Sequence, residues 1–358
     1  MDIKNILKVM REKDASDVFI KLGSPVSMRI KGKVTVLPDT PPLELKEING
    51  FIDSICDEHH KNVFREHKDV DFAIDVGDMG RMRVSLFLQR GVPSLVMRRI
   101  KKDVGNFSEL NLPEEVLTRL SQEIRGLVLL TGPAGSGKST TIASMIENIN
   151  QNSSRHIITI EDPIEFMFQD KKSVINQREL GLDVRSYPAA LRQIVLQSPD
   201  IIFIGTIRDL PTMSAAIVAA EMGILVLGTV HTVNAAQTIE RIENFFPPYQ
   251  HNEVRMQLSF LLKGVISLRL IPRLGAPGRI PACEVMTLTP TISRLIRENK
   301  LNDIPQYLEQ GDMFGMGSFR QSLSRLVRDK KISREDAREF SDSKEELDLE
   351  LKGIKRMR

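Results

Sequence analysis

The chain has 358 residues, of which 41% are hydrophobic and 27% are charged. At about 150 residues per domain this length indicates roughly two domains, and the composition is that of a globular protein, which excludes fibrous and largely disordered classes. Lys and Arg total 50 and Asp and Glu total 47, so the formal net charge is +3. This balance provides no strong field for nucleic acid or for an anionic membrane.

The two cysteines, Cys56 and Cys283, are far apart and form no CxxC pair. A disulfide framework or a structural zinc site is therefore disfavoured, and we expect reduced, buried thiols. No apolar run is long enough to span a bilayer, and the N-terminus carries charges where a secretory signal would be apolar. These features predict a cytosolic protein that is able to dock on a membrane complex.

The first hundred residues indicate a small α+β domain. An amphipathic start is followed by short strand-like runs, a helical stretch at 43–66 and further strands, separated by glycine and proline. The strands are expected at 17–21, 26–30, 33–37, 71–75, 80–87 and 94–100. We place the N-terminal domain at 1–103 and a linker, expected to act as a hinge, at 104–114.

A different pattern begins near residue 126. Apolar runs alternate with helical stretches, as expected of strands buried on both faces of a parallel sheet. These runs lie at 126–131, 156–160, 200–204 and 224–230. A later pair, 265–271 and 279–287, is expected to extend the sheet at an edge. The region from Pro290 onward is predicted to be mostly helical, and the charged tail at 341–358 to be an exposed helix. The second domain, an α/β unit, is placed at 115–358.

A glycine-rich segment between the first apolar run and a helical stretch fits the pattern G-x-x-x-x-G-K-[ST]. In this context the alternative, an ordinary glycine-rich turn, is disfavoured. Glycines allow backbone N–H groups to point at phosphate oxygens, and the following helix N-terminus adds partial positive charge. Lys138 is expected to reach the β- and γ-phosphates, and Ser139 to hold Mg²⁺. The predicted nucleotide-binding residues are Gly132, Pro133, Ala134, Gly135, Ser136, Gly137, Lys138, Ser139 and Thr140.

Three carboxylates, Glu161, Asp162 and Glu165, follow the second apolar run, at the edge of the sheet where ligands bind in open α/β folds. An ATPase needs a carboxylate that orients the attacking water, and Glu165 and Glu161 are the candidates. Capping of the strand end, with Pro163 starting a turn, is the structural alternative. Glu161 is also a candidate magnesium ligand together with Ser139.

The third and fourth apolar runs also end in polar residues. Thr206 stands where the third strand of such a site usually carries an acid, and Arg208 and Asp209 follow it. Arg208 is either a charge sensor or a salt-bridge partner, and Asp209 is interpreted first as a helix cap. His231 follows the fourth run, where an imidazole is able to contact the γ-phosphate.

Four boxes occur in order: GPAGSGKST, TIEDPIEF, SPDIIFIGTIRD and GTVHT. Together they resemble the secretion ATPase superfamily and, more closely, the type IV pilus retraction ATPases of twitching motility (the PilT and PilU group). The resemblance implies a PAS-like N-terminal domain, a RecA-like P-loop ATPase core and a hexameric ring. It also implies that Glu165 is the catalytic glutamate, that His231 is the histidine-box residue and that Arg83 and Arg98 close on the γ-phosphate. From the residues alone, both arginines are solvated strand charges.

The resemblance predicts a homohexameric Mg-ATP-dependent motor that retracts pili, works in the cytoplasm and docks on an inner-membrane platform protein. One departure is that the family's second-motif glutamate falls at Thr206, which carries no charge. We expect ATP, with Mg²⁺, to bind but turnover to be weak. A substituted form, a low-activity paralogue and compensation by Asp200, Asp209 or Glu161 remain open explanations.

Other functions are considered beside this one. The alternative is a catalytically weak, ATP-binding accessory subunit that works beside an active paralogous retraction ATPase. A nucleic-acid motor is disfavoured by the near-neutral charge, the absence of Trp and the presence of only three Tyr. An assembly-direction secretion ATPase is disfavoured because the chain lacks the four cysteines of the zinc insert typical of that group.

Overall fold

The computed structural model describes residues 3–30, 32–38, 40–77, 80–100 and 104–353. The chain divides into two compact units. The first comprises Met1–Asp103 and Glu165–Met167, and the second comprises Val104–Ile164 and Phe168–Arg358. Each unit has its own buried hydrophobic cluster, as expected of a separate domain.

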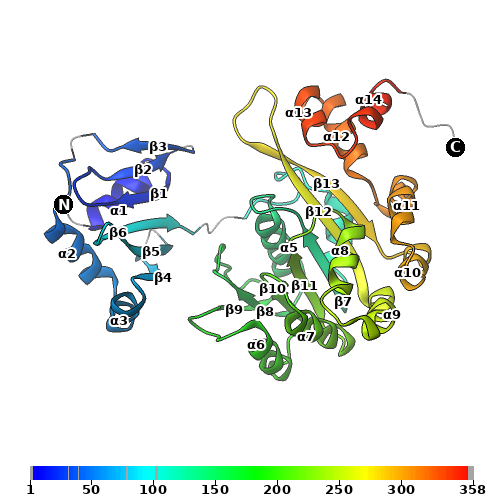
Figure 1. The fold of residues 1–358 in the computed structure, drawn as a ribbon, viewed down its shortest axis with the longest axis horizontal. Helices are drawn as coiled ribbons and strands as arrows, with labels where there is room; N and C mark the ends of the chain where they lie inside the picture. Colours follow the sequence, from blue (N-terminus) through cyan, green and yellow to red (C-terminus); the bar gives the residue numbers. More distant parts are fainter. Residues whose placement is uncertain (1–2, 31, 39, 78–79, 101–103, 354–358) are drawn as a thin grey trace. The chain divides into compact units, whose positions relative to one another are not determined.

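The first unit is a six-stranded sheet covered by three helices on one face (Figure 1). The strand order is β3-β2-β1-β6-β5-β4, and all neighbouring strands are antiparallel. The strands are β1 (Ala15–Ile20), β2 (Ser27–Ile30), β3 (Lys33–Val36), β4 (Asp69–Asp75), β5 (Arg81–Gln89) and β6 (Val92–Arg99), and the helices are α1 (Ile3–Glu12), α2 (Leu45–Ile55) and α3 (Glu58–His67). The predicted α+β character is confirmed.

Alternation along the strands explains which face of this sheet is buried. On β5, Met82 and Val84 are fully buried, whereas Arg81 and Arg83 are half-buried on the opposite face. The single helix expected over 43–66 is two helices, because the chain breaks before α3. There Asp57 caps α3 by accepting a hydrogen bond of 2.8 Å from the backbone N–H of His60.

The second unit is built on a seven-stranded sheet in the order β13-β12-β7-β11-β10-β8-β9. Neighbouring strands from β12 to β9 are parallel, and only the β12–β13 pair is antiparallel. The strands are β7 (Gly126–Thr131), β8 (His156–Glu161), β9 (Val174–Glu179), β10 (Ile201–Ile204), β11 (Leu225–Val230), β12 (Leu262–Pro272) and β13 (Arg279–Thr287). The predicted parallel sheet and its edge pair are confirmed, whereas the polar edge strand β9 was not expected as a strand.

Helices cover both faces of this sheet (Figure 1). One face packs on α4 (Glu114–Ser121) and α5 (Lys138–Asn152). The other packs on α6 (Tyr187–Ile194), α7 (Leu210–Glu221), α8 (Ala235–Glu243) and α9 (His251–Leu261). Because both faces are covered, successive strand residues such as Leu127 and Val128 are equally buried, which explains the continuous apolar runs.

Residues 104–114, which were expected to form a linker, pack on the second unit. Phe107 and Leu112 are buried in the cluster that includes α4 and α5. The carbonyl of Gly105 also accepts a hydrogen bond of 2.8 Å from the Ser144 hydroxyl on α5. Pro113 is the N-cap of α4, in agreement with the helix start expected there.

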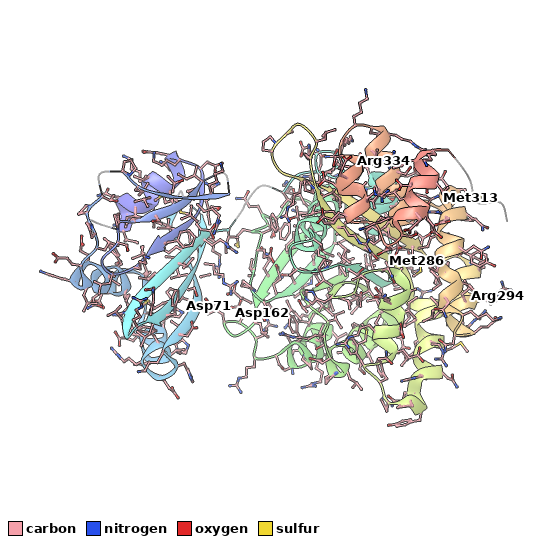
Figure 2. All side chains as sticks on the ribbon, turned by 45° about the horizontal axis from the view of Figure 1, so that its top comes forward. Asp71, Asp162, Met286, Arg294, Met313 and Arg334 are labelled. Atoms are coloured by element: carbon pink, nitrogen blue, oxygen red, sulfur yellow. The ribbon has the colours of Figure 1, made fainter. Side chains whose placement is uncertain are left out.

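The C-terminal region is helical, as predicted. It contains α10 (Pro290–Arg297), α11 (Ile304–Gln310), α12 (Phe319–Arg328), α13 (Arg334–Glu339) and α14 (Lys344–Leu351). Figure 2 shows the exposed Arg294 on α10 pointing away from the sheet that holds the buried Met286.

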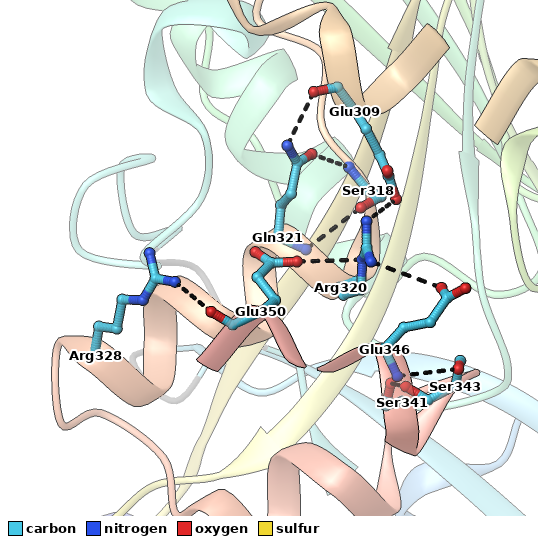
Figure 3. A network of polar contacts seen from close by, with 9 residues as sticks. All are labelled: Glu309, Ser318, Arg320, Gln321, Arg328, Ser341, Ser343, Glu346 and Glu350. Carbon is cyan, nitrogen blue, oxygen red and sulfur yellow. Dashed lines mark hydrogen bonds and ion pairs between the residues drawn. The ribbon is translucent and has the colours of Figure 1, made fainter. Parts of the chain in front are cut away.

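The prediction that the charged tail is an exposed helix is wrong for its apolar side. On α14, Leu347 is fully buried against α12 and α13. Arg320 on α12 forms ion pairs with Glu309 at 2.6 Å, Glu350 at 3.2 Å and Glu346 at 3.7 Å (Figure 3). The charges of the tail therefore bind it to the preceding helices.

Both cysteines are free and buried, as expected. Burial raises the pKa of the Cys56 thiol to about 11 and that of the Cys283 thiol to about 12, so both stay protonated at neutral pH. Within the described part of the chain, no helix combines the length and the apolar character needed to cross a bilayer.

Candidate nucleotide-binding site

Four neighbouring parallel strands, β7, β11, β10 and β8, bring the predicted site loops to one edge of the second sheet. Thr131 pairs with Val230, and Ile204 pairs with both Gly228 and Ile160. The segments that follow β7, β11, β10 and β8 therefore leave the sheet at the same edge. They start at Gly132, His231, Gly205 and Asp162.

The loop after β7 has the backbone that a phosphate cradle requires. Gly132, Gly135 and Gly137 have φ values of +142°, +74° and +99°, which side chains other than glycine rarely adopt. A Cβ on Gly132 would lie 2.5 Å from the Ser136 hydroxyl and 2.6 Å from the Leu268 carbonyl. The loop is therefore folded tightly against β12. Because its glycines have no side chains, none of their own atoms covers their backbone N–H groups.

The polar groups of this loop fit a phosphate. The Lys138 side chain is buried, and its Nζ donates hydrogen bonds to the carbonyls of Gly132 at 2.7 Å and Pro133 at 2.9 Å. The Ser136 hydroxyl is buried and has no hydrogen-bond partner among the described residues. No side chain caps α5 at Gly137. A phosphate would satisfy these donors, since helix N-termini bind anions.

Glu161, the last residue of β8, is buried at the same sheet edge. Its Oε1 accepts hydrogen bonds from the Thr159 hydroxyl at 2.7 Å and from the Gln177 amide at 3.1 Å. Gln177 lies on β9, a strand that the sequence analysis did not expect. Among the described residues no group of three or more His, Cys, Asp and Glu is arranged to hold a metal. Mg²⁺ commonly takes most ligands from phosphates and water, so Ser139 and Glu161 would suffice as protein groups.

The other members of the acidic box are exposed. Asp162 forms an ion pair of 3.6 Å with Arg208, which links the loops after β8 and β10; Figure 2 labels Asp162 on the loop after β8. Of the two roles expected for Arg208, a charge sensor or a salt-bridge partner, the structure shows the salt bridge. Glu165 is exposed and lies four positions after the end of β8. It falls in the short segment assigned to the first unit.

Thr206 is half-buried in the loop after β10. The backbone on both sides is fixed: Gly205 N–H donates to the Ile160 carbonyl and Ile207 N–H to the Thr229 carbonyl, each at 2.8 Å. A glutamate at this position would place a carboxylate between the loops of β8 and β11. The structure has a neutral hydroxyl there.

Two of the three acids considered as compensation for Thr206 have other tasks. Asp209 is the N-cap of α7 and accepts a hydrogen bond of 2.8 Å from the N–H of Thr212, so it is a helix cap. Asp200 precedes β10 and accepts from the N–H of His156 at 2.8 Å, so it lies at the opposite edge of the sheet. Glu161 is the remaining acid at the site edge.

His231 lies beside the phosphate loop. Desolvation lowers the pKa of the imidazole, the positive charges of Lys138 and Arg208 lower it further, and a hydrogen bond to the backbone of Gly132 opposes them. The ring is therefore neutral at pH 7 and adjacent to the lysine that would bind phosphate. The imidazole of His231 therefore lies beside Lys138 and Gly132, next to the loop where the sequence analysis expected it to contact the γ-phosphate.

Arg83 and Arg98 are neighbours in the first unit. They face each other across β5 and β6, and Asp17 on β1 continues the same row. Arg98 Nε donates to Asp17 Oδ1 at 2.7 Å, and Arg83 pairs with Asp71 at 3.1 Å. The Arg98 side chain is 66% exposed, whereas that of Arg83 is 37% exposed. The two arginines thus lie side by side on the strand face that the helices leave uncovered, each paired with an aspartate.

Asp17 itself is almost completely buried between two arginines, with Arg29 Nε at 3.2 Å from its other oxygen. Burial alone would raise the pKa of Asp17, but the hydrogen bond from Ser16 and the charges of Arg98 and Arg29 hold it below its usual value. Asp17 was not among the predicted site residues, although an acidic residue directly before the apolar residues Val18–Ile20 is a signal that the sequence contains.

Comparisons with known proteins extend this geometry. The chain is 39% identical over 98% of its length to the type IV pilus ATPase PilU of Pseudomonas aeruginosa, covering 92% of that protein. It is 42% identical over 95% of its length to the type IV pilus retraction ATPase PilT of the same organism, covering 98% of that protein.

Solved structures agree. The crystal structure of the pilus retraction motor PilT with bound ADP matches with a TM-score of 0.92 and 43% identity, covering 97% of this chain and 99% of that one. The ATPase DotB of Legionella pneumophila matches with a TM-score of 0.77 at 23% identity over 94% of each chain, which shows a shared fold. The predicted architecture, a P-loop ATPase core with a smaller N-terminal domain, is confirmed.

A family model described as type II/IV secretion system protein matches residues 2–311. This match and the two Pseudomonas relatives confirm the resemblance drawn from the four sequence boxes. The chain belongs to the type II/IV secretion system protein family and, within it, to the group that contains the pilus ATPases PilT and PilU.

Proposed function

We propose that this protein is a hexameric, Mg-ATP-dependent motor that drives type IV pilus retraction. As a secretion-family ATPase similar to PilT, it binds and hydrolyses ATP with Mg²⁺. The observation that carries the proposal is the phosphate cradle at Gly132–Thr140, with its buried Lys138 and unpaired Ser136 hydroxyl. The finer steps, namely ring formation, force and weak turnover, are our proposal.

Within the site, each residue receives one task. The N–H groups of the glycine-rich loop and the start of α5 bind the phosphates, and Lys138 exchanges its two carbonyl partners for phosphate oxygens. Ser139 and Glu161 would hold the magnesium ion, which would neutralise charge on the phosphates. His231, neutral at pH 7, has one ring N–H, which would donate a hydrogen bond to a γ-phosphate oxygen.

Hydrolysis further needs a carboxylate that orients the attacking water and a cationic side chain that stabilises the negative charge of the transferring phosphoryl group. Glu165 is assigned the water, and Arg83 and Arg98, from the same or a neighbouring subunit, are assigned the γ-phosphate. Arg98 donates its Nε–H to Asp17, so its remaining guanidinium N–H groups would contact the phosphate. Release of phosphate would then free the N-terminal domain to rotate. Because Gly105, Phe107 and Leu112 are held on the second unit, the proposed hinge is at the start of the 104–114 segment.

Thr206 sets the rate in this proposal. A threonine hydroxyl orders a water but supplies no negative charge, so the affinity for ATP is retained while hydrolysis is slow. The test is steady-state hydrolysis and ATP affinity of the purified protein beside a Thr206→Glu variant. Equal turnover by both proteins would overturn this part of the proposal.

Ring formation is tested separately. Mass photometry of the full chain with saturating Mg-ATP should show a species of six subunits, about 242 kDa from six chains of 40.4 kDa. A monomer under these conditions would contradict the motor. Pili that remain extended in cells lacking the protein, and retract when it is restored, would support the direction of force.

A second candidate is an accessory subunit that binds ATP and works beside an active paralogue. The neutral Thr206 and the 39% identity with PilU favour it. It predicts that the isolated protein hydrolyses ATP slowly yet increases the retraction force of the paralogous ATPase. In both candidates the protein works in the cytoplasm and docks on an inner-membrane platform protein, which co-purification with that platform from detergent would test.

A further inference from the structure

One buried carboxylate outside the predicted site contacts two elements, α8 and β12, that lie next to the site loops. Glu284, on β13, is 7% exposed, and its Oε1 accepts a hydrogen bond of 2.8 Å from the N–H of Ala235, the first residue of α8. The same oxygen lies 3.5 Å from the Ser267 hydroxyl on β12. Glu284 therefore holds the start of α8 against the β12–β13 pair.

The contact continues to the phosphate loop. The Ser267 hydroxyl accepts a hydrogen bond of 3.0 Å from the hydroxyl of Thr131, and all three residues are buried. Thr131 is the last residue of β7, directly before Gly132. A series of contacts thus connects the strand before the phosphate loop to the helix after the His231 segment. It runs from Thr131 through Ser267 and Glu284 to Ala235.

The N-terminus of α8 explains why an acceptor is needed there. The first N–H groups of a helix have no partner within it. Asn234 accepts from the N–H of Gln237 at 2.8 Å, and Glu284 accepts from the N–H of Ala235. The Thr232 and Thr238 hydroxyls, 2.7 Å apart, bind the segment after His231 to the same helix turn.

Charges around Glu284 are already paired. Arg269 on β12 pairs with Asp342 at 2.9 Å, and Arg320 pairs with Glu309 and Glu346 (Figure 3). Glu284, Asp342 and the last three side chains line one cavity of about 250 Å³. Among the described residues, Glu284 accepts hydrogen bonds from neutral donors and forms no ion pair, so it acts by fixing the positions of these donors.

We infer that Glu284 is a positioning residue for the nucleotide site: through Ala235 and the Ser267–Thr131 contact, it fixes the histidine segment and the phosphate loop relative to each other. This inference rests on the proposed binding of ATP at Gly132–Thr140. Small displacements of groups that hold a substrate cost large factors in affinity and rate. No contact between Glu284 and the nucleotide is required.

The test compares three variants with the wild-type chain. Glu284→Ala removes the acceptor, and Glu284→Gln retains an amide oxygen that can accept from Ala235. Ser267→Ala removes the hydroxyl that connects Glu284 to Thr131 and leaves the Ala235 contact in place. Glu243→Gln is the matched control, because Glu243 is an equally buried carboxylate on α8. Among the described residues its side chain pairs with Arg255 and His251, away from the site loops. The probe is fluorescent Mg-ADP, with the dissociation constant as the readout.

We expect Glu284→Ala to weaken ADP binding about tenfold, Ser267→Ala about threefold, and Glu284→Gln and the Glu243→Gln control by less than about twofold. Amide hydrogen exchange without nucleotide should quicken at 131–138 and 235–238 in Glu284→Ala and not in the control. If Glu284→Ala does not fold, Ser267→Ala and the rescue by glutamine carry the comparison.

The inference is overturned if Ser267→Ala and a folded Glu284→Ala bind ADP like the wild type, if glutamine is as damaging as alanine, or if the control loses as much affinity. Failure of the wild-type chain itself to bind ADP is a different result. It would refute the proposed function, and this inference with it.

Discussion

Thr131 and Val230 are paired in register across β7 and β11. The residues that follow them, Gly132 and His231, consequently leave the sheet side by side, and the imidazole reaches the phosphate loop. A histidine that lies far from the loop in sequence thereby becomes a neighbour of Lys138. The following predictions test this site and the units that carry it.

The neighbourhood of His231 predicts a measurable titration. Burial and the Lys138 charge hold the pKa of His231 below its ordinary value of 6.5. Replacing Lys138 with Gln removes one of these causes, so the pKa should rise in Lys138→Gln. NMR titration of the His231 ring protons measures it, with Arg241→Gln, a charge change on α8, as the control. An unchanged or lower pKa in Lys138→Gln would contradict the described contact.

Restoring an acid at Thr206 should restore turnover. A carboxylate that assists the attacking water contributes on the order of a hundredfold or more, so Thr206→Glu should raise kcat at least tenfold. The dissociation constant for ATP should change by less than about threefold, because the phosphate loop is untouched. Thr206→Gln, of similar size but neutral, is the control and should remain slow. Equal rates for the glutamine and glutamate variants would show that charge is not the missing property.

The first unit should depend on Asp17. Loss of a buried carboxylate that binds charged donors costs about 1–3 kcal/mol, so Asp17→Asn should lower the free energy of unfolding of this unit by that amount at pH 7. Because the pKa of Asp17 is lowered in the folded state, its contribution is present above its ordinary pKa of 3.8 and is lost as the pH falls through the folded value. The difference from wild type should therefore shrink towards pH 3.

Denaturant unfolding at the two pH values, followed by hydrogen exchange in β1 and β6, measures this difference. Asp71→Asn is the control, since Asp71 pairs with Arg83 at the surface and such pairs contribute little. A difference for Asp17→Asn that stays constant from pH 7 to pH 3 would refute the role of its charge.

Glu284 predicts a pH dependence of opposite sign. Burial raises its pKa to about 7, so the folded chain binds more protons than the unfolded chain between pH 4.5 and 7. The contribution of the group is fully present below pH 4.5 and is lost as the pH rises through 7. The wild-type free energy of unfolding should fall relative to that of Glu284→Gln across this range, by on the order of 2–3 kcal/mol. Parallel stability curves for the two proteins would contradict the raised pKa.

Much of the second unit follows from its sequence, for physical reasons. Strands buried on both faces need continuous apolar residues, which made β7, β8, β10 and β11 visible. The phosphate loop is visible because its glycines and lysine are required at fixed spacing. In contrast, β9 is a polar edge strand whose pairing with β8 depends on tertiary contacts, and no local pattern indicates it.

The remaining misses have the same origin. The tail was expected to be exposed because its charges dominate, yet Leu347 packs against α12 and α13 while Arg320 gathers three carboxylates. Glu284 is a single acid in an apolar strand. The pairing of β13 with β12 and of β12 with β7 connects it through Ser267 to Thr131, directly before the phosphate loop. Such contacts depend on sheet order, which a local pattern does not contain.

The claim on which the account depends is that the loop ending at Lys138 binds a nucleoside triphosphate, and calorimetry on the full chain tests it most directly. Titration of the wild type with Mg-ATP should release heat and fit one site per chain, whereas Lys138→Ala should bind at least tenfold more weakly because the buried ammonium group is lost. Absence of binding by the wild type, or equal affinity in Lys138→Ala, would contradict it.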